Sequence, residues 1–285
     1  MKGTCALFDF ECELQKSHIL PKFIGTYFTL TGSKFLRAAA NPNKRLQDLD
    51  KMYLLSKDAE EKFSIYEKWF AENIFKPYQL NQNMDFEYND KLYYFSISVL
   101  WRVLKRELHY HNYKEKPFFT KALRTEFEWR KFLKDFEFPR NYCKINIFLT
   151  DRVMYHDFNL SGVDYYFSRA IDSTIVSNDD GSYCFVYAKF LKFIIFGFID
   201  GFNEEEFKST LINPISGRIT VPQPIYDQEF LRYYFYRIRE INALPSASQN
   251  QQKIINDQFF KEYEDLKNKE AWEIILNDWN NLNPI

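Results

Sequence analysis

The chain has 285 residues, of which 46% are apolar and 19% aromatic, with 30 Phe and 20 Tyr. This length and composition allow a large core without disulfides or metal, and they argue against extensive disorder. The formal net charge of -1 lacks the broad basic excess that is typical of a dedicated nucleic-acid-binding protein. The longest apolar stretch, 185–199, contains Lys189 and Lys192 and is too short to span a bilayer.

Cysteine usage and the N-terminus both indicate a cytoplasmic protein. The four cysteines, Cys5, Cys12, Cys143 and Cys184, are scattered without a disulfide framework, which fits a reducing compartment. Residues 1–10 lack a basic region followed by an apolar stretch, so no secretory signal is expected. We therefore expect a cytoplasmic protein that does not interact with membranes.

The first 80 residues contain short elements followed by one amphipathic helix. A short helix is expected at 21–30, because proline is tolerated in the first turn of a helix. Apolar residues recur every three or four positions over 56–75, which predicts a longer helix with Ser56 as its N-cap. A polar stretch then marks the expected boundary between a module of residues 1–80 and a second region of residues 81–285.

Beyond residue 80 the pattern predicts helices, then strands, then helices again. Helices are expected over 89–137 and over 227–281. A sheet is expected over 144–221, with strands at 144–150, 164–176, 182–198 and 217–221. The expected fold class is therefore α+β.

One constellation near the N-terminus is more informative than the rest of the chain. It consists of Cys5-Ala6-Leu7-Phe8, then Ser17-His18-Ile19-Leu20-Pro21, then the helix start at 53–60. Over residues 5–75 this layout resembles an HNH endonuclease module of uncharacterised bacterial proteins, which often have defence functions. The resemblance implies a degenerate HNH-like or treble-clef-like ββα module, followed by a larger helical and antiparallel-sheet region.

Most zinc ligands of the family are missing from this chain. The knuckle positions are occupied by Cys5, Phe8, Ser56 and Ala59, and neither Phe nor Ala can coordinate a metal. Cys12 is displaced in spacing and is a poor substitute. A structural zinc is therefore not expected, and packing around Phe8 is expected in its place.

The catalytic half of the resemblance is better preserved. It implies that His18 is the general base for attack of water on phosphorus, and that Glu60 is a ligand of a divalent ion. A carboxylate suits Mg²⁺ or Mn²⁺. The middle residue of the family motif has no clean counterpart, because Asn43, Asp48 and Asp50 all lie in the intervening loop. Asp50 completes the candidate metal set with His18 and Glu60, although the sequence does not choose among the three.

Each of these residues also has a purely structural interpretation. His18 can be held by a backbone carbonyl before the helix, and Glu60 can complement the helix dipole. Two hypotheses for the function follow. The first is a divalent-metal-dependent nuclease that acts on DNA or RNA in bacterial defence. The second is a catalytically inactive HNH-like scaffold that acts as a binding or structural subunit of a larger complex. In this case the aromatic helical and β region would contact protein, nucleic acid or a small ligand, and the partner could also be a second copy of the chain.

Other parts of the sequence add weaker candidates. His156 next to Asp157 suggests an oriented histidine, and residues 144–227 can hold an unrelated ligand site without a linear motif. The sequence contains no P-loop, no Gly-x-Gly-x-x-Gly, no Gly-x-Ser-x-Gly and no His-Glu-x-x-His motif. Nucleotide hydrolysis, Rossmann cofactor binding, serine hydrolysis and zincin chemistry therefore have no support.

Overall fold

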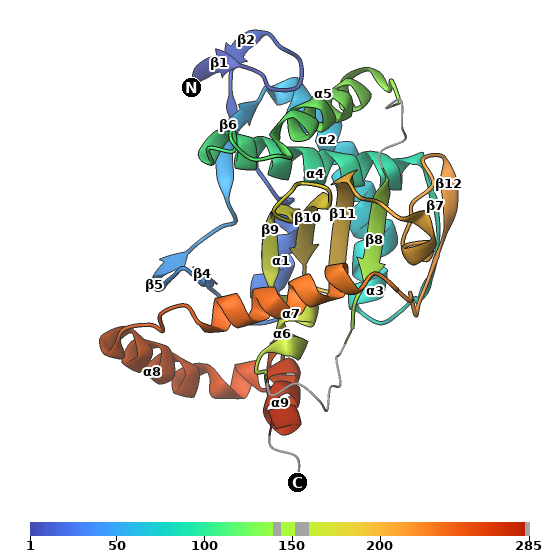
Figure 1. The fold of residues 1–285 in the computed structure, drawn as a ribbon. Coiled ribbons are helices and arrows are strands. Elements are labelled where there is room, and N and C mark those ends of the chain that lie inside the picture. Colours follow the sequence, from blue (N-terminus) through green and yellow to red (C-terminus); the bar gives the residue numbers. More distant parts are fainter. Residues whose placement is uncertain (139–143, 152–159, 283–285) are drawn as a thin grey trace.

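The computed structural model describes residues 1–138, 144–151 and 160–282 and confirms the predicted α+β class (Figure 1). The strands are β1 (Lys2–Thr4), β2 (Glu11–Glu13), β3 (Gln15–His18), β4 (Leu36–Ala38), β5 (Asn41–Leu46), β6 (Lys51–Leu55), β7 (Asp85–Asn89), β8 (Ile145–Leu149), β9 (Ile171–Ser177), β10 (Cys184–Phe190), β11 (Phe193–Asp200) and β12 (Ser216–Thr220). The helices are α1 (Lys22–Leu30), α2 (Lys57–Phe70), α3 (Lys76–Gln79), α4 (Asp90–Tyr110), α5 (Phe119–Asp135), α6 (Val163–Arg169), α7 (Gln228–Asn242), α8 (Gln249–Leu266) and α9 (Glu270–Leu282). Among the described residues, no helix is long and apolar enough to cross a membrane.

The largest sheet is antiparallel and has the strand order β8-β11-β10-β9. Successive side chains of a strand point to opposite faces of a sheet. Accordingly, Val186 and Ala188 of β10 join a core cluster that contains most of α4, whereas Phe185 and Tyr187 join a second cluster with α7. The two helices therefore cover opposite faces of the sheet, with α7 crossing in front in Figure 1.

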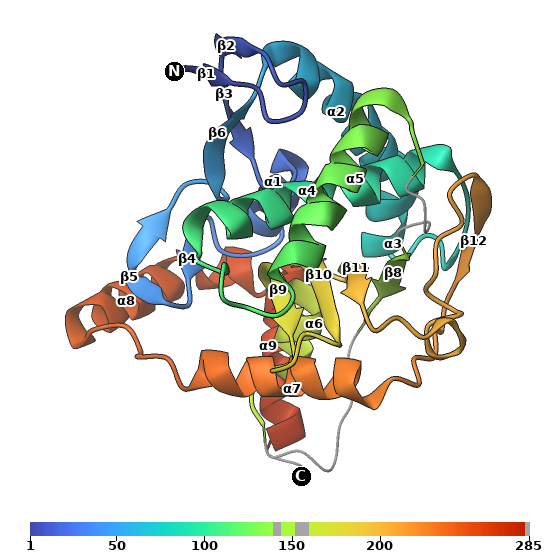
Figure 2. The same ribbon diagram turned by 45° about the horizontal axis from the view of Figure 1, so that its top comes forward.

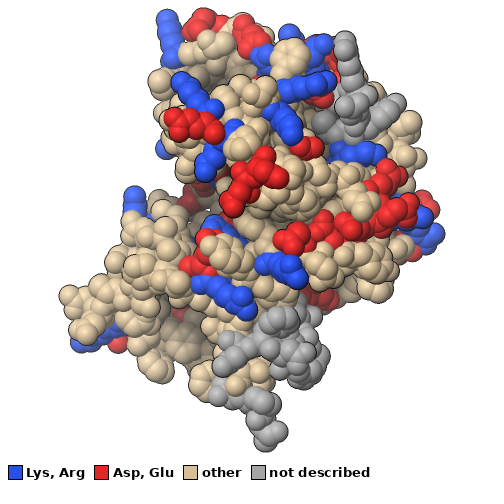
Figure 3. Space-filling view, in the orientation of Figure 1, with Lys and Arg blue, Asp and Glu red and all other residues tan. Residues whose placement is uncertain are grey.

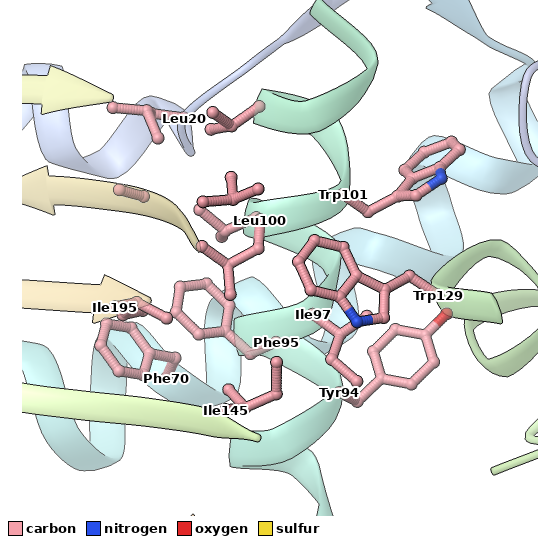
Figure 4. Close-up of a cluster of buried hydrophobic side chains, with 14 of the residues drawn as sticks. Leu20, Phe70, Tyr94, Phe95, Ile97, Leu100, Trp101, Trp129, Ile145 and Ile195 are labelled. Atoms are coloured by element: carbon pink, nitrogen blue, oxygen red, sulfur yellow. The ribbon is translucent and has the colours of Figure 1, made fainter. Parts of the chain in front are cut away.

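Helix α4 is the centre of the larger cluster and is apolar on nearly every side. Phe95 of α4 stacks on Phe70 of α2 with ring centroids 4.0 Å apart. Figure 4 shows these rings near Ile195 of β11, with Trp129 of α5 on another side of α4. The cluster combines residues from before and after position 80, so the first 80 residues pack against the rest through a shared core.

Two strand predictions are wrong in part. The first half of 164–176 forms α6, because the backbone N–H groups of Asp164 and Tyr165 donate to Asp278 of α9, a distant contact that local sequence does not reveal. The segment 182–198 is not one strand but a hairpin of β10 and β11. Its almost unbroken apolar run gives no alternation that would mark the turn.

The helix predictions are more accurate. The helix expected at 21–30 is α1, and that at 56–75 is α2 followed by a π-helical turn at Ala71–Phe75. The regions 89–137 and 227–281 contain α4, α5, α7, α8 and α9. Long periodic segments are the ones whose type is easiest to predict.

Candidate functional site

His18 lies at the end of the first strand of a strand–strand–helix unit. Strands β3 and β6 are antiparallel, with His18 opposite Lys51 and Lys16 opposite Tyr53. Helix α2 begins directly after β6, with Ser56 as its N-cap. Figure 2 shows this unit beside the N-terminal strands, at the end of the molecule away from α7.

Asp48 orients the imidazole of His18. Their Nε2 and Oδ1 atoms are 3.0 Å apart. Partial burial raises the pKa of Asp48, but hydrogen bonds from Lys51, His18 and the Leu49 N–H group lower the pKa to about 2. Asp48 is therefore ionised at neutral pH and can only accept, so the N–H of Nε2 donates this hydrogen bond. A carboxylate in contact with one imidazole nitrogen fixes the orientation of the ring.

The structure distinguishes Asn43, Asp48 and Asp50, the three candidates for the middle residue of the motif. Asp48 is the partner of His18. The carboxylate of Asp50 instead lies 3.6 Å from Arg106, measured from Oδ2 to Nη1. The side chain of Asn43 accepts a backbone N–H at the start of α8, 2.8 Å away. Of the three, Asp48 therefore occupies the position that acts on His18.

Arg102 of α4 fixes the end of β3 from inside the protein. Its Nη1 donates to the carbonyl oxygen of His18 at 3.0 Å, and its Nη2 lies 2.8 Å from Oε1 of Glu67. The guanidinium also lies over the ring of Phe63, 5.3 Å from the centroid. Arg102 is only 2% exposed. These contacts anchor the backbone of His18 to both α2 and α4, and no sequence motif identified Arg102.

The candidate metal ligands point to different partners. His18 faces Asp48, Asp50 faces Arg106, and Glu60 lies in the first turn of α2. The Oε1 atom of Glu60 is buried and has no hydrogen-bond partner in the described parts of the chain. Within those parts, no group of three or more His, Cys, Asp or Glu side chains could hold a metal ion. As arranged here, these donors do not fit the Mg²⁺ or Mn²⁺ site that the resemblance implies.

Three of the four lost zinc positions lie together. The Ser56 N–H group donates to Sγ of Cys5 at 3.2 Å, and that thiol lies 3.5 Å from Oγ of Ser56. The same Oγ accepts the N–H of Ala59 at 3.3 Å. Phe8 packs against the core and stacks on Phe10, with centroids 6.1 Å apart. Hydrogen bonds thus link Cys5, Ser56 and Ala59 to one another.

Replacing Ser56 with Ala is expected to lower the free energy of unfolding by about 1 kcal/mol, the usual cost of losing a helix N-cap. Ser64→Ala is the matched control, because Ser64 is exposed on the same helix and is expected to change this free energy by less than about 0.5 kcal/mol. Urea unfolding curves measure both. Equal losses in the two variants would contradict a capping role for Ser56.

A cavity of about 210 Å³ lies near the strand–strand–helix unit. Its walls include Ile19 and Leu49, the chain neighbours of His18 and Asp48, together with Arg106, but not His18 or Asp48 themselves. Arg106 is held in place because its Nη2 donates to the carbonyl oxygen of Ser173 and to Glu107, both at 2.6 Å. The carboxylates of Asp50 and Asp172 also line the cavity, so its charge is mixed and does not by itself favour a phosphate.

His156 and Asp157, as well as Cys143, lie outside the described residues. No family model matches this sequence, and no curated protein or solved structure matches it either. Function therefore has to be argued from the site itself.

Proposed function

We propose that this chain is an HNH-like protein that acts on nucleic acid, with His18 as the general base of phosphodiester cleavage. The supporting observation is the 3.0 Å contact between Nε2 of His18 and Oδ1 of Asp48. This pair lies at the strand end of the unit formed by β3, β6 and α2, where the resemblance puts the catalytic histidine. In this proposal the unit is a degenerate ββα module.

In this mechanism His18 acts from its neutral form. Its Nδ1 takes a proton from the attacking water or hydroxyl as the new bond to phosphorus forms, and Asp48 stabilises the resulting imidazolium. The leaving oxygen takes its proton from solvent. A positioned general base contributes roughly 10² to 10⁴ in rate.

A second candidate is a catalytically inactive HNH-like scaffold. Two observations favour it: Cys5 and Ser56 satisfy each other in place of zinc, and the candidate metal ligands face other protein groups. The face in Figure 3 also mixes acidic and basic side chains instead of showing one basic surface. In this case the ββα unit would support binding without chemistry.

Cleavage assays separate the two candidates. The full chain is incubated with plasmid DNA, single-stranded DNA and RNA, each with Mg²⁺, Mn²⁺ or EDTA. We expect at least one substrate to be cleaved. Activity in EDTA would support catalysis by the dyad alone, whereas activity only with an added ion would contradict a mechanism that needs only the dyad. No cleavage by the folded chain would contradict the proposal and favour the scaffold.

A further inference from the structure

A second, larger hollow lies between the N-terminal strands, β6 and the C-terminal end of α4. It has a volume of about 500 Å³, which is within the usual range for small-ligand sites. Its lining residues are Met1, Thr4, Ala6, Met52, Tyr53, Leu54, Lys105, Leu108, His109 and Tyr110. We call this hollow the β6–α4 groove. It is separate from the cavity lined by Arg106, with which it shares no lining residue.

The groove combines an apolar floor with exposed aromatic rings. Met52, Leu54 and Leu108 supply apolar surface. Tyr53 is 48% exposed and Tyr110 is 61% exposed, so part of each ring is open to solvent. Exposed aromatic rings in a hollow provide flat surfaces on which another planar ring can stack.

The polar groups of the groove favour an anionic ligand. Lys105 is its one cationic side chain among Lys and Arg, and the imidazole of His109 lies one helical turn away on α4. No carboxylate is among the lining residues, although Glu126 lies 3.4 Å from Lys105. A ligand with planar rings and negative charge therefore complements this surface.

We propose that the β6–α4 groove binds the bases and phosphates of a single-stranded nucleic acid. Stacking requires unpaired bases, because the faces of bases in a duplex are already covered. Tyr53 lies on β6 two residues from Lys51, the cross-strand neighbour of His18, so the groove and the dyad share this strand pair. The inference rests on the proposed function for the class of ligand, and it adds a preference for unpaired strands.

Fluorescence anisotropy with the full chain tests this inference. The probes are labelled single-stranded DNA and RNA of about 12 nucleotides, within the site size of known single-strand binders, and a duplex of the same length. We expect tighter binding of a single strand than of the duplex. The double variant Tyr53→Ala/Tyr110→Ala should bind roughly 10- to 100-fold more weakly, as expected for lost base stacking.

Matched variants make the result specific. Tyr53→Phe/Tyr110→Phe keeps both rings and should keep the affinity. Tyr236→Ala removes a ring that is 58% exposed on α7, away from the groove, and should bind like the wild type. Lys105→Gln should reduce the slope of log affinity against log salt by about one, as for one lost phosphate contact.

Two outcomes would overturn the inference: no preference of the folded wild type for single strands, or wild-type affinity in Tyr53→Ala/Tyr110→Ala. The variant His18→Ala separates this result from the proposed function, because it should lose cleavage and keep binding. If the wild type binds single strands through the groove but cleaves no substrate, the proposed nuclease function is wrong and the proposed binding by the groove still holds.

Discussion

Replacing Asp48 with Asn is expected to slow nucleic-acid cleavage by about 10²- to 10⁴-fold, the range that general acid–base catalysis contributes, because the general base loses the carboxylate that orients it. An amide is neutral and does not stabilise the imidazolium. Its NH₂ group can also donate to Nε2, which would favour the tautomer with the proton on Nδ1, the atom that must accept a proton. Single-turnover rates on the best substrate of the cleavage assays measure the effect.

The matched control for this prediction is Asp58→Asn. Asp58 is exposed in the first turn of α2, so the substitution makes the same change in charge within the same unit. We expect the control to retain the wild-type rate. Equal rates in Asp48→Asn and Asp58→Asn would show that the contact between His18 and Asp48 is structural.

Replacing Asp172 with Ala is expected to reduce the free energy of unfolding by about 1 to 3 kcal/mol, the usual cost of leaving buried hydrogen-bond donors without their acceptor. Asp172 of β9 accepts hydrogen bonds from Arg237 at 2.9 and 3.1 Å, from Tyr187 at 2.7 Å and from Tyr166 at 3.0 Å. The substitution leaves these donors without their acceptor between the sheet and α7. Urea unfolding measures the loss.

The pH dependence of this loss has a definite sign. Burial raises the pKa of Asp172, but Arg237, Tyr187 and Tyr166 lower it below its ordinary value. A carboxyl group whose pKa is lower in the folded protein contributes stability above its unfolded pKa of about 4, and this contribution is lost as pH falls through the folded pKa. The gap between wild type and Asp172→Ala should therefore narrow below about pH 4.

Asp200→Ala serves as the control for Asp172. Asp200 forms an ion pair with Lys121 at the end of β11 and is 37% exposed. Exposed pairs contribute about 1 kcal/mol or less. If Asp172→Ala loses no more free energy of unfolding than Asp200→Ala, the contacts of Asp172 with Arg237, Tyr187 and Tyr166 do not stabilise the fold as argued.

The sequence predicts the helices better than the site, for physical reasons. The apolar period over α2 and the long apolar run of α4 mark helices locally. The hairpin of β10 and β11 is hidden in a run that is buried on both faces and therefore lacks alternation. Helix α6 depends on Asp278, more than a hundred residues away in the chain.

The candidate site was accessible to sequence reasoning only in part. The Ser-His-Ile-x-Pro segment pointed to His18, but the choice of Asp48 over Asp50 depends on how the loop between β3 and β6 folds back. The position of Lys51 opposite His18 follows from strand pairing once β3 and β6 are aligned. Arg102 and one wall of the β6–α4 groove come from α4, which meets β3 and β6 only in the folded chain.

The most direct test of this account is the cleavage rate of His18→Ala beside that of His111→Ala, with the wild type as reference. His111 is 57% exposed at the end of α4 and belongs to neither hollow, so its loss controls for removing a surface imidazole. The account predicts that the wild type and His111→Ala cleave alike, whereas folded His18→Ala is at least about 100-fold slower. Cleavage by His18→Ala at the wild-type rate would contradict it.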